Sequence, residues 1–224
     1  MKKRLKLVFL IAFVLIFTSD SLGRKKEKPK KFNPNLYLTP ALRYSLVGKG
    51  LALRYEPQLV SMAVQINDEL ACDRFELVNT SLSPMASIGF FASPTLGASI
   101  RFLGVIARVN IKLTYFPDTD AGRLGSALDA FGKDLLRILG NTLSNIPDPS
   151  VRGAVLILIY SKAQLSDPNY FQQAEAVVIF ISREVLAEFN AFRIRFNQLF
   201  NMSEIYSFKG EHQIQIMLNE FLQG

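Results

Sequence analysis

The apolar residues of this chain are most concentrated in two short segments of its second half. Gly153–Tyr160 and Ala174–Ile181 consist almost wholly of aliphatic residues, many of them β-branched. That composition is typical of strands buried on both faces. The two segments lie almost symmetrically about the turn sequence Ser-Asp-Pro-Asn at 166–169. We therefore expect them to pair as a long antiparallel hairpin, with a crossover through a short helix at 162–173 as the alternative.

Apolar residues spaced three and four apart predict four helices, because that spacing places them on one face of a helix. The first is Pro57–Ala71, which begins with a proline suited to a first turn. The second is Ala121–Ser144, which follows the capping sequence Asp-Thr-Asp. The third follows the cap Ser182 and has its apolar stripe at Val185, Phe189, Phe192, Phe196 and Leu199; the fourth covers about Gly210–Leu222 and buries Ile214, Met217, Leu218 and Phe221.

The first half of the chain carries weaker strand patterns. Leu42–Val47 and Leu51–Tyr55 alternate apolar and polar residues around Gly-Lys-Gly, which predicts a β-hairpin with a glycine-rich turn. Further strands are expected within Asp73–Asn79, at Ser87–Ala92 and over Gly97–Phe116, the longest of them.

The order of these elements predicts an α+β fold with a mostly antiparallel sheet and three to four helices packed on one face. Polar and apolar residues alternate over Arg108–Tyr115, so that strand should have one side open to solvent. Residues 41–224 are expected to form a single domain, with two halves meeting near Pro117 as the alternative.

The start of the chain has the order of a secretory signal peptide. Four basic residues in Met1–Lys6 precede eleven apolar residues, Leu7–Phe17, and then a short polar segment that ends at Gly23. Eleven residues are few for a bilayer-spanning helix, which needs about 20. We expect residues 1–23 to be removed on export to the periplasm, the cell envelope or the medium. An uncleaved membrane anchor over residues 5–22 is the alternative, because positive charge after an apolar run hinders translocation.

The formal charge of +7 belongs to the N-terminal segment. Residues 1–31 hold ten Lys and Arg against two acidic residues, whereas residues 32–224 hold sixteen against seventeen. Nucleic-acid binding by the body of the protein is therefore disfavoured. Residues 24–40 are expected to be a basic, disordered linker. Its cationic residues are also candidates for contact with anionic headgroups: Lys25, Lys26, Lys28, Lys30 and Lys31.

Few residues offer catalytic chemistry. His212 is the only histidine and Cys72 the only cysteine, so two-histidine zinc motifs and an intramolecular disulfide are excluded. Cys72 is expected to be a small buried apolar side chain. Asp118 and Asp120 are the best candidates for a divalent-cation site, with helix capping as the competing interpretation. No phosphate loop or dinucleotide motif occurs, and no cofactor is expected.

Ser83–Leu103 contains one charged residue, Arg101, among 21. It is either buried sheet or a surface that meets a protein or a bilayer. In the second case Phe90 and Phe91 are suited to insertion. Asn79 and Asn201 begin glycosylation sequons, which matter only in a eukaryotic host.

These observations favour an exported, non-catalytic module that binds a protein or assembles in the cell envelope. A metal-dependent hydrolase or transferase that uses Asp118 and Asp120 is one alternative. A protein that associates with lipid or a membrane surface is the other.

Overall fold

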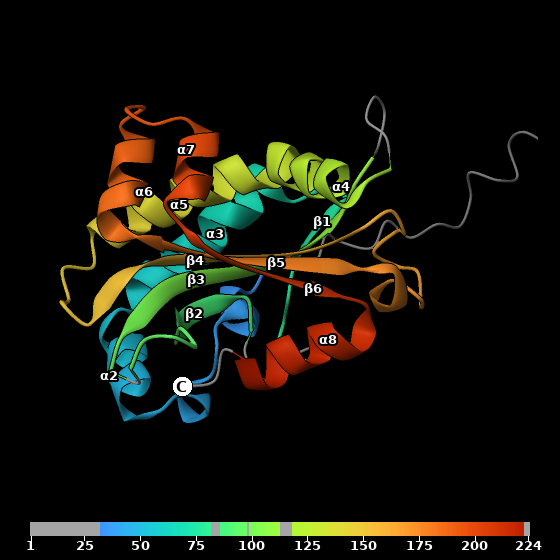
Figure 1. Ribbon diagram of the computed structural model, residues 1–224. Coiled ribbons are helices and arrows are strands. Elements are labelled where there is room, and N and C mark those ends of the chain that lie inside the picture. The colour runs from blue at the N-terminus through green and yellow to red at the C-terminus, as the bar shows by residue number, and fades with distance from the viewer. Residues whose placement is uncertain (1–31, 82–85, 98, 113–117, 222–224) are drawn as a thin grey trace, which may run out of the picture. The chain divides into compact units, whose positions relative to one another are not determined.

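A computed structural model of the 224-residue chain gives the fold (Figure 1). The structure describes residues 32–81, 86–97, 99–112 and 118–221. The predicted signal peptide and residues 24–31 of the predicted linker lie outside the described residues. Residues 32–40 of that linker are described and include the 3₁₀ helix η1 (Pro34–Tyr37). Described residues from Asn33 onward belong to one compact unit. None of the helices among them is long and apolar enough to span a bilayer.

The unit is α+β and is built on one mixed, six-stranded sheet with the order β1-β3-β4-β5-β6. β2 pairs beside β1 along the same edge of β3, so β1 and β2 together act as one interrupted edge strand. Four of the five strand pairings are antiparallel, whereas β3 and β4 are parallel. The strands are β1 (Phe75–Leu77), β2 (Ile88–Phe91), β3 (Arg101–Asn110), β4 (Val151–Ser161), β5 (Glu175–Ser182) and β6 (Glu204–Lys209).

The predicted central hairpin is confirmed. β4 and β5 pair antiparallel from Gly153 opposite Ser182 to Tyr160 opposite Glu175. Nearly every residue of the two strands is buried. β3 and β4 are joined by the long helical segment α4 (Asp120–Ala127), η3 (Leu128–Gly132) and α5 (Lys133–Ser144), which follows the predicted 121–144 helix. A parallel pair needs such a crossover connection.

Helices cover both faces of the sheet, so the expectation of helices on one face was wrong. α3 (Glu56–Leu70), α5, α6 (Arg183–Asn190) and α7 (Phe196–Asn201) lie on one side, while α2 (Leu46–Arg54) and α8 (Glu211–Ile216) lie on the other (Figure 1). The α8 side contains a large apolar cluster, in which Ile214 and Met217 join Ile157 and Val178. Because both faces are covered, β3 is buried along its whole length. Arg108 and Asn110, which were predicted to face solvent, are therefore buried, whereas Lys112, just beyond β3, is exposed as predicted.

The predicted hairpin at 42–55 is also wrong, because this segment forms the short 3₁₀ helix η2 (Ala41–Arg43) and then α2. Contacts of Tyr44 explain why this segment forms a helix and not a hairpin. A Cβ atom added to Gly48 would lie 2.8 Å from the Tyr44 ring, and the Tyr44 hydroxyl accepts a hydrogen bond from the Phe90 amide at 3.1 Å. The glycine therefore allows α2 to pack closely on a tyrosine that is fixed to the sheet.

The last third of the chain differs from the prediction in two respects: the helix predicted to run from Ser182 through Leu199 is divided into α6 and α7, and a further strand follows. Ser182 caps α6 through the Val185 amide, as expected. The helix then ends near Phe192, which has a positive φ of 58° and is 90% exposed. A sixth strand, β6, follows α7 and was not predicted. The final helix is confirmed as α8 and η5 (Met217–Phe221), with Ile214, Met217 and Leu218 buried; the Phe221 side chain lies outside the description.

Candidate functional site

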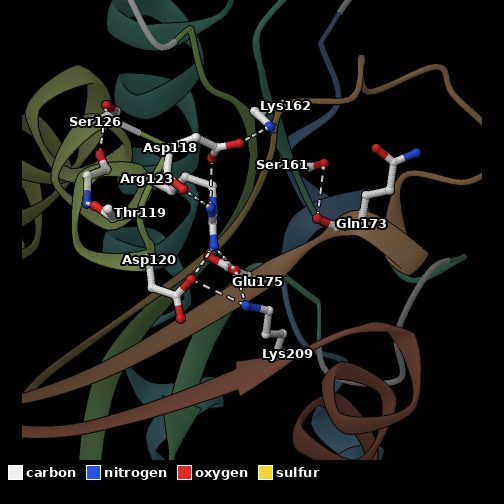
Figure 2. A network of polar contacts seen from close by, with 11 residues as sticks. Asp118, Thr119, Asp120, Arg123, Ser126, Ser161, Lys162, Gln173, Glu175 and Lys209 are labelled. Carbon is white, nitrogen blue, oxygen red and sulfur yellow. Dashed lines mark hydrogen bonds and ion pairs between the residues drawn. The ribbon is translucent and has the colours of Figure 1, made fainter. Parts of the chain in front are cut away.

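Charged side chains gather beyond the carboxyl ends of β3 and β4. In sheets with parallel strands, ligands bind preferentially at such ends. After β3 the chain continues to Asp118 and to Asp120 at the start of α4, where the Thr119 hydroxyl caps the helix by accepting a hydrogen bond from the Gly122 amide at 3.1 Å. We call this group the charged cluster (Figure 2); it consists of Asp118, Asp120, Arg123, Lys162, Glu175 and Lys209.

Arg123 lies at the centre of the charged cluster. Its Nη2 and Nε donate to the two oxygens of Glu175 at 2.7 and 3.2 Å. Its Nη1 donates to Asp118 at 2.7 Å, and Nη2 also contacts Asp120. One guanidinium on α4 therefore bonds three carboxylates from two elements and a loop.

Two lysines complete the charged cluster. Lys162, just after β4, bonds Asp118. Lys209, at the end of β6, lies 3.1 Å from Glu175 and 3.3 Å from Asp120. Glu175 pairs across the sheet with both Tyr160 and Lys209, so the three side chains form one row over β4, β5 and β6. Each of the three carboxylates thus has at least two cationic partners.

These contacts hold the carboxylates in their ionised form. Burial alone would raise the pKa of Glu175, but the hydrogen bonds from Arg123 and Lys209 outweigh it and the pKa is lowered. Hydrogen bonds from Lys162 and Arg123 lower the pKa of Asp118, and Lys209 does the same for Asp120. A carboxyl pair that performs acid–base catalysis needs its pKa values pushed apart. Here the pKa values of Asp118, Asp120 and Glu175 are all lowered.

A cavity of about 330 Å³ opens beside the charged cluster. Burial raises the pKa of Tyr160 on its wall, and the neighbouring Glu175 carboxylate raises it further. Tyr160 is therefore neutral and Glu175 ionised. The two side chains interact with each other on the cavity wall, and Glu175 is also bonded to Arg123 and Lys209. The lining residues are Asp120, Ala121, Leu124, Tyr160, Glu175, Ser207, Phe208, Lys209 and Gln213.

The two residues predicted to bind a cation are brought together, but they face Arg123. Asp118 and Asp120 both contact its guanidinium, which occupies the space between them (Figure 2). Among the described residues, no group of three or more His, Cys, Asp or Glu side chains could hold a metal ion. Within the described part of the chain, the fold therefore brings no third metal-ligating side chain to Asp118 and Asp120.

The other candidate residues lie apart from the charged cluster. Phe90 and Phe91 are buried in β2, which fits the buried-sheet interpretation of these positions and not the alternative of an exposed insertion tip. Cys72 is exposed rather than buried as predicted, because it lies in the turn between α3 and β1. His212 is exposed at the start of α8. Lys25, Lys26, Lys28, Lys30 and Lys31 lie outside the described residues.

Sequence reasoning missed an exposed apolar surface on η2 and α2. Leu42 is 89% exposed, Leu46 88% and Leu53 59%. Leu46, Gly50 and Leu53 are spaced four and three apart, so they share the outer face of α2, while Leu51 and Ala52 are buried beneath. Exposed Arg43 and Lys49 lie on the same two elements. We call Leu42, Arg43, Leu46, Lys49 and Leu53 the α2 surface.

Comparisons of the chain with models of known protein families, with curated proteins and with solved structures found no match. The charged cluster and the α2 surface are thus interpreted from their own geometry.

Proposed function

We propose that this protein is an exported, non-catalytic module of the cell envelope and that the α2 surface is its contact surface. The single observation that carries the proposal is the exposure of Leu42 and Leu46, each nearly nine-tenths open to solvent on adjacent short helices. Single exposed apolar residues are ordinary, but grouped ones are typical of interaction sites. Fully covering a leucine side chain is worth about 1.5–3 kcal/mol.

The geometry of the charged cluster supports a non-catalytic role. Arg123 joins the crossover helix to the central hairpin through Glu175, and the remaining carboxylates are also paired with cations. Such a network stabilises the arrangement of α4, β5 and β6 without leaving a carboxylate unpaired for catalysis. The metal-dependent hydrolase or transferase remains a separate hypothesis, and the cation titration described in the Discussion tests it.

The experiment compares full-length chains in cells of the native host. Leu42→Ser/Leu46→Ser removes apolar area from the α2 surface. Phe192→Ser/Met202→Ser is the matched control, because these two apolar residues are 90% and 56% exposed and lie beside α6 and α7. The fraction of each chain retained on washed envelopes is measured by quantitative blotting.

We expect the Leu42→Ser/Leu46→Ser chain to lose at least tenfold in retention, since that factor corresponds to only about 1.4 kcal/mol of contact free energy. The control chain should be retained like the wild type. Equal melting temperatures of the purified chains establish that both variants fold. Retention of the Leu42→Ser/Leu46→Ser chain at the wild-type level would contradict the proposal.

A further inference from the structure

We infer that the occupant of the α2 surface is the anionic headgroup region of a phospholipid bilayer. This inference rests on the proposed function, since it names the partner of the same surface. Three observations support it: the charge of the segment, the position of Arg101, and the sequence that leads into η2.

Residues 41–55 contain Arg43, Lys49 and Arg54 and no acidic residue. Arg54 pairs with Asp148 at 2.8 Å. Within the described part of the chain, Arg43 and Lys49 have no carboxylate partner at ion-pair distance. Leucines flanked by long cationic side chains are typical of helices that lie in a membrane interface. Protein–protein contacts favour aromatic residues and disfavour lysine at their centre.

Arg101 adds positive charge behind the start of α2. Its side chain is buried, with the residue 1% exposed, and it bonds the Ile100 carbonyl at 3.0 Å and the Ser45 hydroxyl. Its guanidinium has no carboxylate partner among the described residues and keeps its charge. Ser45 is the N-cap residue of α2, and the first turn of α2 has no acidic residue. The helix dipole therefore adds to the positive potential at Leu46.

The most basic segment of the chain precedes this surface in sequence. Residues 24–55 contain nine Lys and Arg against one Glu. One basic residue near an anionic bilayer increases binding by about a factor of five, which corresponds to about 1 kcal/mol. The contact with the bilayer is made by the leucines of the α2 surface together with Arg43 and Lys49, and the sequence that precedes them has the same sign of charge.

The test measures flotation of full-length chains with phosphatidylcholine vesicles, with and without phosphatidylglycerol. Arg43→Glu/Lys49→Glu reverses the charge of the α2 surface. Lys133→Glu/Arg193→Glu makes the same change in net charge at exposed positions on α5 and after α6, on the opposite side of the sheet (Figure 1). All variants share the same N-terminal segment, so its contribution to binding is common to them.

We expect phosphatidylglycerol to increase binding of the wild-type chain and added salt to decrease it. Arg43→Glu/Lys49→Glu should bind these vesicles at least tenfold less tightly, and Lys133→Glu/Arg193→Glu should remain within about twofold of the wild type, since exposed charges far from the contact contribute little. Leu42→Ser/Leu46→Ser should weaken binding to both kinds of vesicle. Equal losses in the two charge variants would overturn the inference.

The outcomes also separate this inference from the proposed function. If the wild-type chain binds neither kind of vesicle, but Leu42→Ser/Leu46→Ser still loses retention on native envelopes, the occupant is a protein and only the lipid inference fails. If Leu42→Ser/Leu46→Ser behaves like the wild type on vesicles and on envelopes alike, the α2 surface is not a contact surface and both fail.

Discussion

Arg123 and Glu175 lie 52 positions apart and form a two-point contact in which one guanidinium donates to both oxygens of one carboxylate. The side chains are only 15% and 10% exposed. The contact joins the helix that connects β3 to β4 with the strand that follows them. It therefore fixes the helical layer against the sheet at the end where the charged cluster lies.

Removing this arginine should destabilise the fold. Arg123→Met leaves Glu175 with Lys209 as its one remaining cation in the charged cluster, and we expect a loss of about 2–3 kcal/mol, somewhat below the range for a fully buried pair. Denaturation by urea measures it. Arg137→Met is the matched control, because Arg137 pairs with exposed Glu69 and should contribute at most about 1 kcal/mol. Equal losses in the two variants would contradict this account of the cluster.

The contribution of Glu175 should depend on pH. Its pKa in the folded protein is below the ordinary value of 4.5, so its ionised contacts stabilise the fold fully above that value and are lost as the pH falls below it. The difference in free energy of unfolding between the wild type and Glu175→Gln should therefore be larger at about pH 7 than at about pH 3. A difference that is the same at both pH values would show that ionisation of Glu175 does not matter.

The central hairpin was predictable because its signal is local. Ala174–Ile181 carries buried residues on both faces, and that composition is best satisfied by a central strand.

Substitutions in β4 and β5 test the assigned core directly. Val155→Asp or Ile179→Asp places a carboxylate at a position with no exposure and should cost several kcal/mol. Arg152→Asp, at an exposed position of β4, is the control and should fold normally. Soluble, cooperative folding of the first two variants would contradict the assigned core.

The errors in the prediction arise where distant contacts decide the local structure. The alternation over Leu42–Tyr55 fits a hairpin, and α2 forms instead because Tyr44 packs between Gly48 and Gly89, 41 positions apart. The charged cluster could not be assembled from sequence because Glu175 and Lys209, which complete it, lie 52 and 86 positions from Arg123. β6 did carry a usable signal, since half-buried Tyr206 and Phe208 alternate with exposed Ser207 and Lys209.

A cation bound by Asp118 and Asp120 and the pairing of both residues with Arg123 lead to opposite predictions for the effect of added cations on the melting temperature. Because Asp118 and Asp120 are already paired with Arg123, millimolar Mg²⁺ or Ca²⁺ should not raise the melting temperature of the wild-type chain. Asp118→Asn/Asp120→Asn is the control. A cation-dependent rise in the wild type that is absent from this variant would favour the metal-dependent enzyme instead.

The most direct test of the central claim is whether residues of the α2 surface become shielded from solvent when the protein binds envelope vesicles. Cys72 is exposed, so Cys72→Ser first removes the one native thiol. A polarity-sensitive fluorophore is then attached through Leu42→Cys or, as the control, through Met202→Cys. On adding native envelope vesicles, we predict a blue shift of emission from position 42 and no shift from position 202. A shift at 202 without one at 42, or no shift at either position, would contradict the claim that the α2 surface is the contact surface.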